Sequence, residues 1–230
     1  MYQKSPQSFF LGFKDIAPLL VGTAPFGIIF GALCVQNQLT FFSSQSMSLF
    51  VFAGSSQLVA LNLLSNDSLI ITILIATFFI NIRHLLYGLS FGRKIKNCTK
   101  KEKFFLSFFL TDESFSIISR YDVVGMSYYL GAAISMYINW QFWTFVGIFF
   151  GKNFENYYDF NISFLMVPAF LVILWPQIKG KLAINCFIIS VFFSIFLIEL
   201  PFQLGLFFSP LLGILLSISI DYFFNKIKSN

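Results

Sequence analysis

Eight runs of apolar residues follow one another along the chain, each separated from the next by a short polar stretch. Most are long enough for a helix that crosses the hydrocarbon core of a bilayer, which takes roughly 20 residues. Backbone polar groups must be paired internally in lipid, so helices are the expected elements. The repeated alternating strands of an outer-membrane barrel are missing from the pattern. The runs cover about residues 16–36, 43–64, 68–91, 104–119, 126–150, 160–177, 184–200 and 204–224.

Two of these runs are interrupted by polar residues. The second contains Gly54, Ser55, Ser56 and Gln57 in its middle, and the fourth is short and contains Thr111–Ser114. Broken segments of this kind are tolerated in membranes where they line a cavity inside the protein. The pattern predicts an all-α, polytopic transmembrane helix bundle, with about six full spans and two broken or re-entrant segments. Residues 1–230 are expected to form a single integral membrane domain.

The charge pattern bears on the topology. Segment 92–103 has six basic residues and one acidic residue, which accounts for the whole net charge of +5. Basic loops favour the cytoplasmic side. If all eight runs cross from an internal N-terminus, this segment lies outside, whereas it lies inside if the two interrupted runs do not cross. The second arrangement also places Lys179, Lys181 and the C-terminal tail in the cytoplasm. An external N-terminus with a different number of spans stays open.

The composition restricts the class of protein. The chain is 57% hydrophobic and 11% charged, whereas soluble domains have about 25% charged residues. This indicates an integral membrane protein, and a basic excess confined to one loop does not suggest a nucleic-acid surface. There is no phosphate-binding loop, no HExxH motif and no second His, so neither ATP hydrolysis by that route nor a His-rich zinc site is expected. We expect no enzyme, no cofactor and no metal.

The densest polar group in the chain comprises Asn81, Arg83, His84 and Tyr87, near the end of the third run. A charged side chain in hydrocarbon is costly and normally faces a partner or a water-filled path. Arg83 suits a carboxylate, and His84 is a group that titrates near neutral pH. The alternative is that Arg83 extends to the cytoplasmic surface beside the basic loop.

Asp112 and Glu113 in the fourth run are the candidate partners of Arg83. Adjacent residues on a helix point about 100° apart, so the two acids cannot face the same group. One can neutralise Arg83 while the other carries a proton, although a short amphipathic segment in the membrane interface is an alternative. The stretch Gly54–Gln57 can present backbone amides to a carboxylate, or it can be a simple helix kink. Asp159 is expected to cap a helix.

These motifs occur in an order that resembles the AzlC family, the large permease subunit of branched-chain amino acid exporters. The resemblance covers about residues 10–180, and its most specific parts are Asn81–Gly88 and Thr111–Glu113. The other matching motifs are Pro25-Phe26-Gly27 with Gly31, Ala53-Gly54-Ser55-Ser56-Gln57, and Asp159-Phe160.

The resemblance implies a multi-pass protein of the bacterial inner (cell) membrane that exports branched-chain, hydrophobic amino acids. It also implies use of the proton motive force and a small membrane partner of the AzlD type. From the charge pattern, both termini are expected in the cytoplasm. A passive channel, an importer subunit for another small solute, and a non-transporting membrane scaffold are the rival functions. The expected substrate and ion pathway comprises Gly54, Ser55, Ser56, Gln57, Asn81, Arg83, His84, Tyr87, Asp112 and Glu113.

Overall fold

The computed structural model describes residues 6–95, 98–154, 178, 180–200 and 205–228. Their regular structure is helical, apart from an isolated bridge between Ile95 and Val124. The predicted all-α class is therefore confirmed, while Asp159 and the apolar run 160–177 lie outside the described residues. The helices are α1 (Phe9–Gln36), α2 (Phe41–Val51), α3 (Gly54–Ser65), α4 (Ile70–Asn81), α5 (Arg83–Lys94), α6 (Lys100–Ser107), α7 (Asp112–Ser119), α8 (Met126–Phe154), α10 (Gly180–Phe196) and α11 (Gly205–Lys228).

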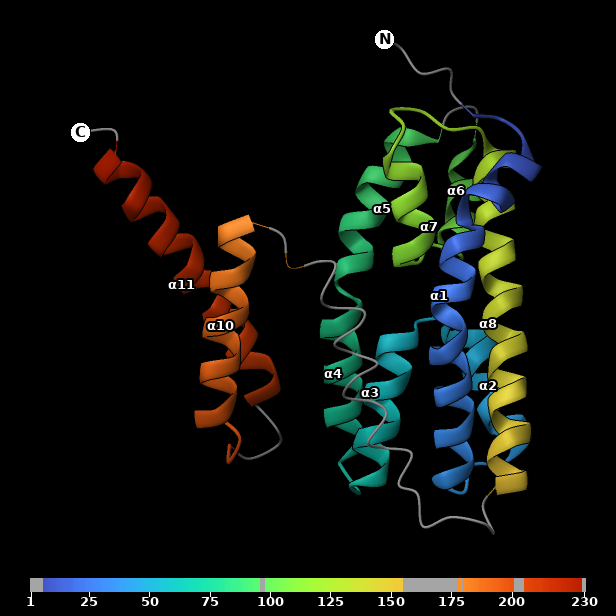
Figure 1. Ribbon diagram of the computed structural model, residues 1–230, viewed down its shortest axis with the longest axis horizontal. Helices are drawn as coiled ribbons and strands as arrows, with labels where there is room; N and C mark the ends of the chain where they lie inside the picture. Colours follow the sequence, from blue (N-terminus) through green and yellow to red (C-terminus); the bar gives the residue numbers. More distant parts are fainter. Residues whose placement is uncertain (1–5, 96–97, 155–177, 179, 201–204, 229–230) are drawn as a thin grey trace.

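Helices α1 and α8 lie side by side over most of their length (Figure 1). Glycines bring the two backbones together: a Cβ atom added to Gly31 would overlap the Thr144 carbonyl oxygen, and one added to Gly147 would overlap the Ile28 carbonyl oxygen. Small residues permit this close approach of membrane helices. By contrast, a Cβ added to Gly88 or Gly92 meets nothing within 4 Å. We call the contact between α1 and α8 the glycine seam.

Both runs with polar interruptions form broken helices. The second divides into α2 and α3 at Phe52, whose backbone is left-handed with φ 40°. The fourth divides into α6 and α7, and the side chain of Thr111 caps α7 by accepting a hydrogen bond from the Ser114 amide. Thr and Ser are favoured at such starts because their oxygens satisfy free amides of the first turn. Each break separates two helices that can then take different directions.

Two segments in the described part of the chain are long and apolar enough to cross a membrane. They are α1 and the joined pair α4–α5, which spans Ile70–Lys94. Helix α4 exposes large apolar side chains such as Ile70 and Phe78, which are 75% and 62% exposed. Apolar exposure on this scale is expected where lipid or another membrane helix covers the surface. The count of six full spans stays a prediction.

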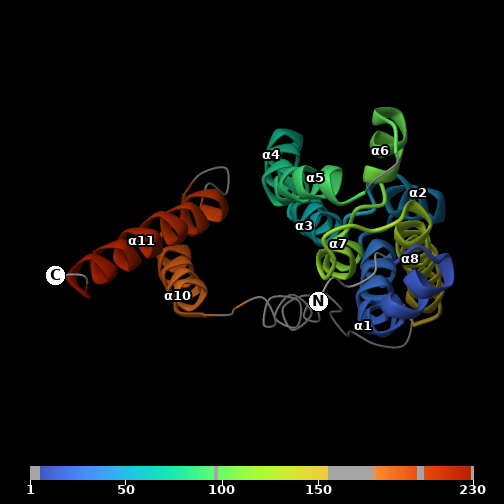
Figure 2. The same ribbon diagram turned by 90° about the horizontal axis from the view of Figure 1, so that it is seen from above.

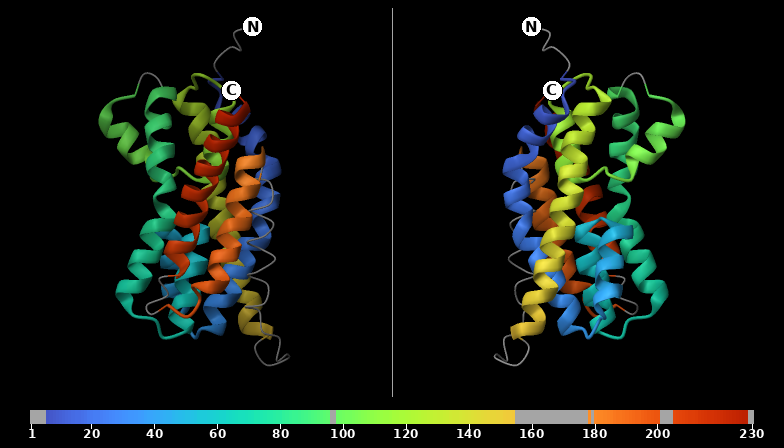
Figure 3. Two further views of the ribbon diagram at one scale, coloured as in Figure 1. Left: turned by 90° about the vertical axis from the view of Figure 1, so that its left-hand side faces the viewer. Right: turned by 90° about the vertical axis from the view of Figure 1, so that its right-hand side faces the viewer.

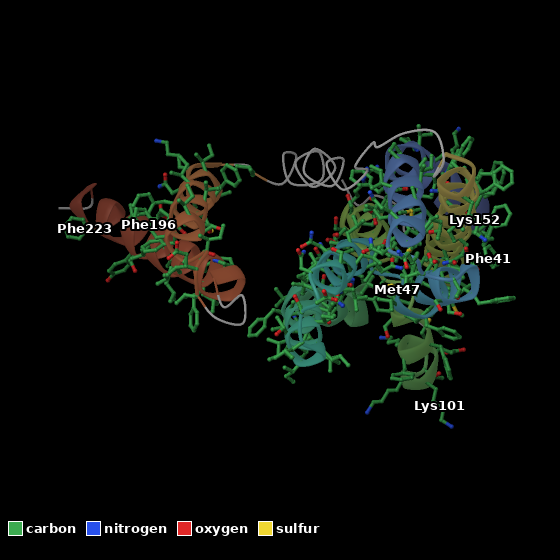
Figure 4. The ribbon with its side chains drawn as sticks, turned by 90° about the horizontal axis from the view of Figure 1, so that it is seen from below. Phe41, Met47, Lys101, Lys152, Phe196 and Phe223 are labelled. Carbon is green, nitrogen blue, oxygen red and sulfur yellow. The ribbon has the colours of Figure 1, made fainter. Side chains whose placement is uncertain are left out.

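The last two described helices, α10 and α11, pack against each other (Figure 2), and a few residues of α11 also come near α4. Helix α10 is aligned roughly with α1 and α8 (Figure 3). In the short helix α6, Lys101 extends away from the bundle (Figure 4), and Phe104 and Phe105 are more than 70% exposed. Helix α6 thus exposes basic and aromatic side chains, as expected of a short amphipathic segment in the membrane interface. Helix α7, by contrast, has buried residues in the protein interior.

Candidate functional site

A cavity of about 60 Å³ lies where α1, α3, α5, α7 and α8 meet. Its polar lining comes mainly from the starts of α3, α5 and α7, and its apolar lining comes mainly from α1, α8 and the break before α3. The polar side chains are Thr23, Ser55, Arg83, His84, Thr111, Asp112 and Glu113, and the others are Phe26, Phe52, Ala53, Gly54, Leu58, Met136 and Trp140.

An ion pair joins Arg83 to Asp112 within this lining. The Arg83 Nη1 atom lies 2.7 Å from Asp112 Oδ2, and each side chain is 28% exposed. Arg83 Nη2 donates a hydrogen bond to Ser55 Oγ over 2.5 Å, whereas Arg83 Nε is buried without a partner. Tyr87 donates a hydrogen bond of 2.8 Å to Asp112 Oδ1. Both oxygens of Asp112 are thus bound, by charge-assisted contacts of the stronger kind.

Helix starts place these groups at the cavity. Helix α7 begins at Asp112, so both acids stand in its first turn, where the helix dipole favours negative charge. Helix α3 begins at Gly54 after Ala53, whose methyl group cannot accept a hydrogen bond from the first amides of the helix. The first amides of a helix have no acceptor within it, and the first helical bond here is from Gln57 N to Ala53 O. Within the described residues, the start of α3 therefore has no side-chain cap and lines the cavity.

Glu113 and His84 complete the ionisable groups. No Lys or Arg in the described residues lies within ion-pair distance of Glu113, although the Arg83–Asp112 pair is next to it in the lining. The His84 Nδ1 atom lies 3.2 Å from the Asn81 carbonyl oxygen, and its ring meets Tyr87 edge-on at 5.8 Å. The cavity therefore contains one guanidinium group and two carboxyl groups.

Four of the ten residues expected from the sequence do not line this cavity: Ser56, Gln57, Asn81 and Tyr87. Ser56 and Gln57 are fully buried, because each step along α3 turns the side chain about 100° away from Ser55. Ser56 accepts a hydrogen bond of 3.3 Å from Asn81 Nδ2 and donates one of 2.9 Å to the Ala53 carbonyl. Hydrogen bonds thus join Asn81 to Ser56 and Tyr87 to the lining residue Asp112, whereas the side-chain amide of Gln57 has no partner among the described residues.

The apolar lining is the part that the sequence reasoning missed. Phe26 was noted only as part of a motif, and Phe52, Leu58, Met136 and Trp140 were not singled out. Phe occurs 34 times in the chain, so an aromatic residue carried no positional signal. One clue was available for Phe52. It directly precedes the polar break Gly54–Gln57, and residues at that break line the same cavity.

Comparison with known proteins agrees with the order of motifs. A family model described as AzlC protein matches residues 18–154. An uncharacterized membrane protein of Helicobacter pylori strain 26695 is 31% identical over 74% of this chain and 78% of its own length. The branched-chain amino acid transport protein AzlC of Bacillus subtilis is 31% identical over 74% of this chain and 68% of its own. Inner membrane protein YgaZ of Escherichia coli is 26% identical over 86% of both chains.

No solved structure matches the chain. The family model covers more than half of the sequence and includes residues 18–36 of α1 and the whole of α2 to α8. All residues that line the cavity fall inside the matched range. Its relatives are named as membrane and transport proteins. The chain is therefore a membrane protein that belongs to the AzlC family.

Proposed function

We propose that this chain is the large permease subunit of an exporter of branched-chain amino acids in a bacterial inner membrane, driven by the proton motive force. The observation that carries the proposal is the lining of one cavity by Arg83, two carboxyl groups and an apolar wall. An amino acid with an aliphatic side chain has three complementary parts: a carboxylate for Arg83, an ammonium group for the carboxyl groups and an apolar group for the apolar wall. The family and the printed name of the Bacillus subtilis relative support this substrate class.

The substrate carboxylate is assigned to Arg83 and the start of α3. Guanidinium groups bind carboxylates with two parallel hydrogen bonds. The uncapped first turn of α3 adds amides and the positive end of a helix dipole, an arrangement that favours anions.

The substrate ammonium group is assigned to the two acids at the start of α7. Beside one guanidinium, two ionised carboxylates leave one negative charge uncompensated. A proton or an ammonium group compensates that charge, but both cannot do so at Glu113 at the same time. Mutual exclusion of substrate and proton is the requirement for exchange, in which protons entering the cell drive the substrate out. Glu113, which has no cationic partner in the described residues, is the residue we assign to this exchange.

The cavity is small beside a typical ligand pocket. Its volume of about 60 Å³ holds on the order of five water molecules. Ligand pockets are generally larger, roughly 300–1,000 Å³ for drug-sized molecules. In the proposed exporter, the polar and apolar sides of the cavity separate when a substrate enters.

Transport in proteoliposomes tests the proposal. Vesicles containing the purified protein and loaded with labelled leucine should lose it faster when a pH gradient drives protons against the direction of leucine efflux. Glu113→Gln, which mimics the protonated carboxyl group, should abolish the response to the pH gradient and weaken leucine binding. Efflux that ignores the pH gradient would instead indicate a passive channel, and no movement of any amino acid would indicate a scaffold.

A small membrane subunit of the AzlD type is part of the proposal. Exposed apolar faces on α4 and α10 leave room for further helices against this chain. Expressed alone, the chain should give cells little resistance to the toxic leucine analogue azaleucine, and co-expression with a small subunit from a neighbouring gene should restore resistance. Full export by the single purified chain in proteoliposomes would contradict the need for a partner.

A further inference from the structure

One residue of the apolar lining, Trp140 of α8, is held in an unusual position. Its indole ring stacks on Phe30 of α1, with ring centres 6.3 Å apart and planes inclined by 28°. On another side, the ring lies against the Cα atom of Gly54, where α3 begins. Trp140 is only 5% exposed, yet it lines the same cavity as Arg83 and the two acids. The ring is thus fixed between two helices at the edge of the site.

The glycine at position 54 is what leaves space for this ring. A Cβ atom on Gly54 would lie 2.7 Å from Trp140 Cη2 and 3.1 Å from Cζ2. Since ordinary contacts between carbon atoms lie near 3.5–4.0 Å, any side chain there displaces the indole. The ring has Phe30 on another side, so the space it can move into is limited. The pair Gly54–Trp140 therefore determines how much of the cavity the indole fills.

The polar atom of the indole supplies a second, independent observation. Trp140 Nε1 is buried and has no hydrogen-bond partner among the described residues. Buried Trp N–H groups usually find a partner, and leaving one unpaired costs about 1–3 kcal/mol. Packing, rather than an internal hydrogen bond, positions the ring.

We infer that Trp140, resting on Gly54, is the specificity residue that sets the largest side chain the site accepts. This inference rests on the proposed function, because it concerns which amino acids bind. Met136 lies one turn before Trp140 on the same helix and lines the same cavity, so the ring and the thioether form the α8 side of the site. A smaller group at position 140 enlarges the site, and a larger group at position 54 pushes the indole inward and shrinks it.

Two substitutions with opposite expected effects test the inference. Thermal stabilisation of the purified protein, with its small subunit where needed, is titrated with alanine, valine, leucine and phenylalanine. Trp140→Phe should raise the affinity for phenylalanine relative to valine about tenfold, within the 10–200-fold range that small volume changes in apolar pockets produce. Gly54→Ala should lower the same ratio, with the largest amino acid losing most.

Trp143→Phe is the matched control. Trp143 lies on the same helix and does not line the cavity, and its N–H donates a hydrogen bond of 3.0 Å to Asn139 Oδ1. Its substitution should leave the ranking of amino acids unchanged. If Trp140→Phe and Gly54→Ala keep the wild-type ranking while the protein still binds leucine, Trp140 does not select the side chain. If the wild-type protein binds no amino acid at all, the proposed function fails, and this inference fails with it.

Discussion

Arg83 joins two helix starts through its guanidinium group, because one nitrogen binds Ser55 on α3 and another binds Asp112 on α7. The same side chain is assigned to the substrate carboxylate, so binding has to loosen at least one of these contacts. Tyr87 donates a second hydrogen bond to Asp112, so this carboxylate does not depend on Arg83 alone. The internal contacts of the pair resemble those that we propose for the substrate.

Neutralising only Arg83 or only Asp112 should reduce the yield of folded protein more than neutralising both. Removing one partner of a fully buried pair costs roughly 3–5 kcal/mol, and an exposure of 28% for each side chain puts this pair below that range. We expect Arg83→Gln and Asp112→Asn each to abolish leucine export and to reduce the yield of folded protein. The double variant should recover folded protein, measured by fluorescence-detected gel filtration, but not export.

Arg120→Gln is the control for this series, because Arg120 is exposed at the end of α7. It should behave as the wild type in both measurements. Normal export by both single variants would remove Arg83 and Asp112 from the proposed site.

The sequence identifies the charged residues of the cavity more readily than the apolar ones. Arg83 and Asp112 stand out because charges are expensive inside apolar runs, and that cost makes a pairing between them a reasonable expectation. Trp140 has no such signal, since an aromatic residue is unremarkable in a chain with 34 Phe. Its position at the cavity follows from the packing of α8 on α1, which the sequence does not specify.

Among the elements, the glycine seam should be the least tolerant of substitution. Gly147→Ala places a methyl group on the Ile28 carbonyl oxygen, so α1 and α8 must separate. Overpacking of this kind typically costs about 1–3 kcal/mol. Gly88→Ala meets open space and should be neutral or stabilise its helix by up to about 1 kcal/mol. Thermal unfolding of the two purified variants checks the difference, and equal melting temperatures would contradict the close contact.

The interruptions of helices were predictable, but their details were not. Polar residues in the middle of apolar runs indicated the breaks before Gly54 and Asp112, because only a broken segment leaves polar backbone for a cavity. The left-handed residue Phe52 and the missing cap at Ala53 were not predictable. A bulky aromatic residue rarely adopts a positive φ, so only the tertiary environment explains it.

For the whole molecule, the thiol of Cys98 tests the topology. It lies in the basic segment 92–103, which we expect in the cytoplasm. In a variant with Cys34→Ala and Cys186→Ala, a membrane-impermeant maleimide should label Cys98 only after the cells are permeabilised. Burial, and after it the carboxylate of Glu102, raises the pKa of the Cys98 thiol. The reactive thiolate is therefore scarcer at neutral pH than in a free cysteine, and labelling should quicken as the pH rises.

Equal labelling before and after permeabilisation would place Cys98 outside and overturn the arrangement with an internal N-terminus and two segments that do not cross. The same experiment with a single cysteine introduced at Lys101, which extends away from the bundle (Figure 4), controls for access, because that position is exposed.

The net charge of the cavity affects how readily the carrier returns without a bound proton. With Arg83, Asp112 and Glu113 all ionised, the vacant site has a net charge of −1, and a bound proton brings that charge to zero. In the proposed exporter, a vacant carrier that turns inward after releasing an amino acid outside moves its negative charge against the negative interior of the cell. A full crossing at 100 mV costs about 2.3 kcal/mol per elementary charge. The membrane voltage therefore retards the uncoupled return and leaves the protonated return unhindered, so slippage should increase as the voltage is collapsed.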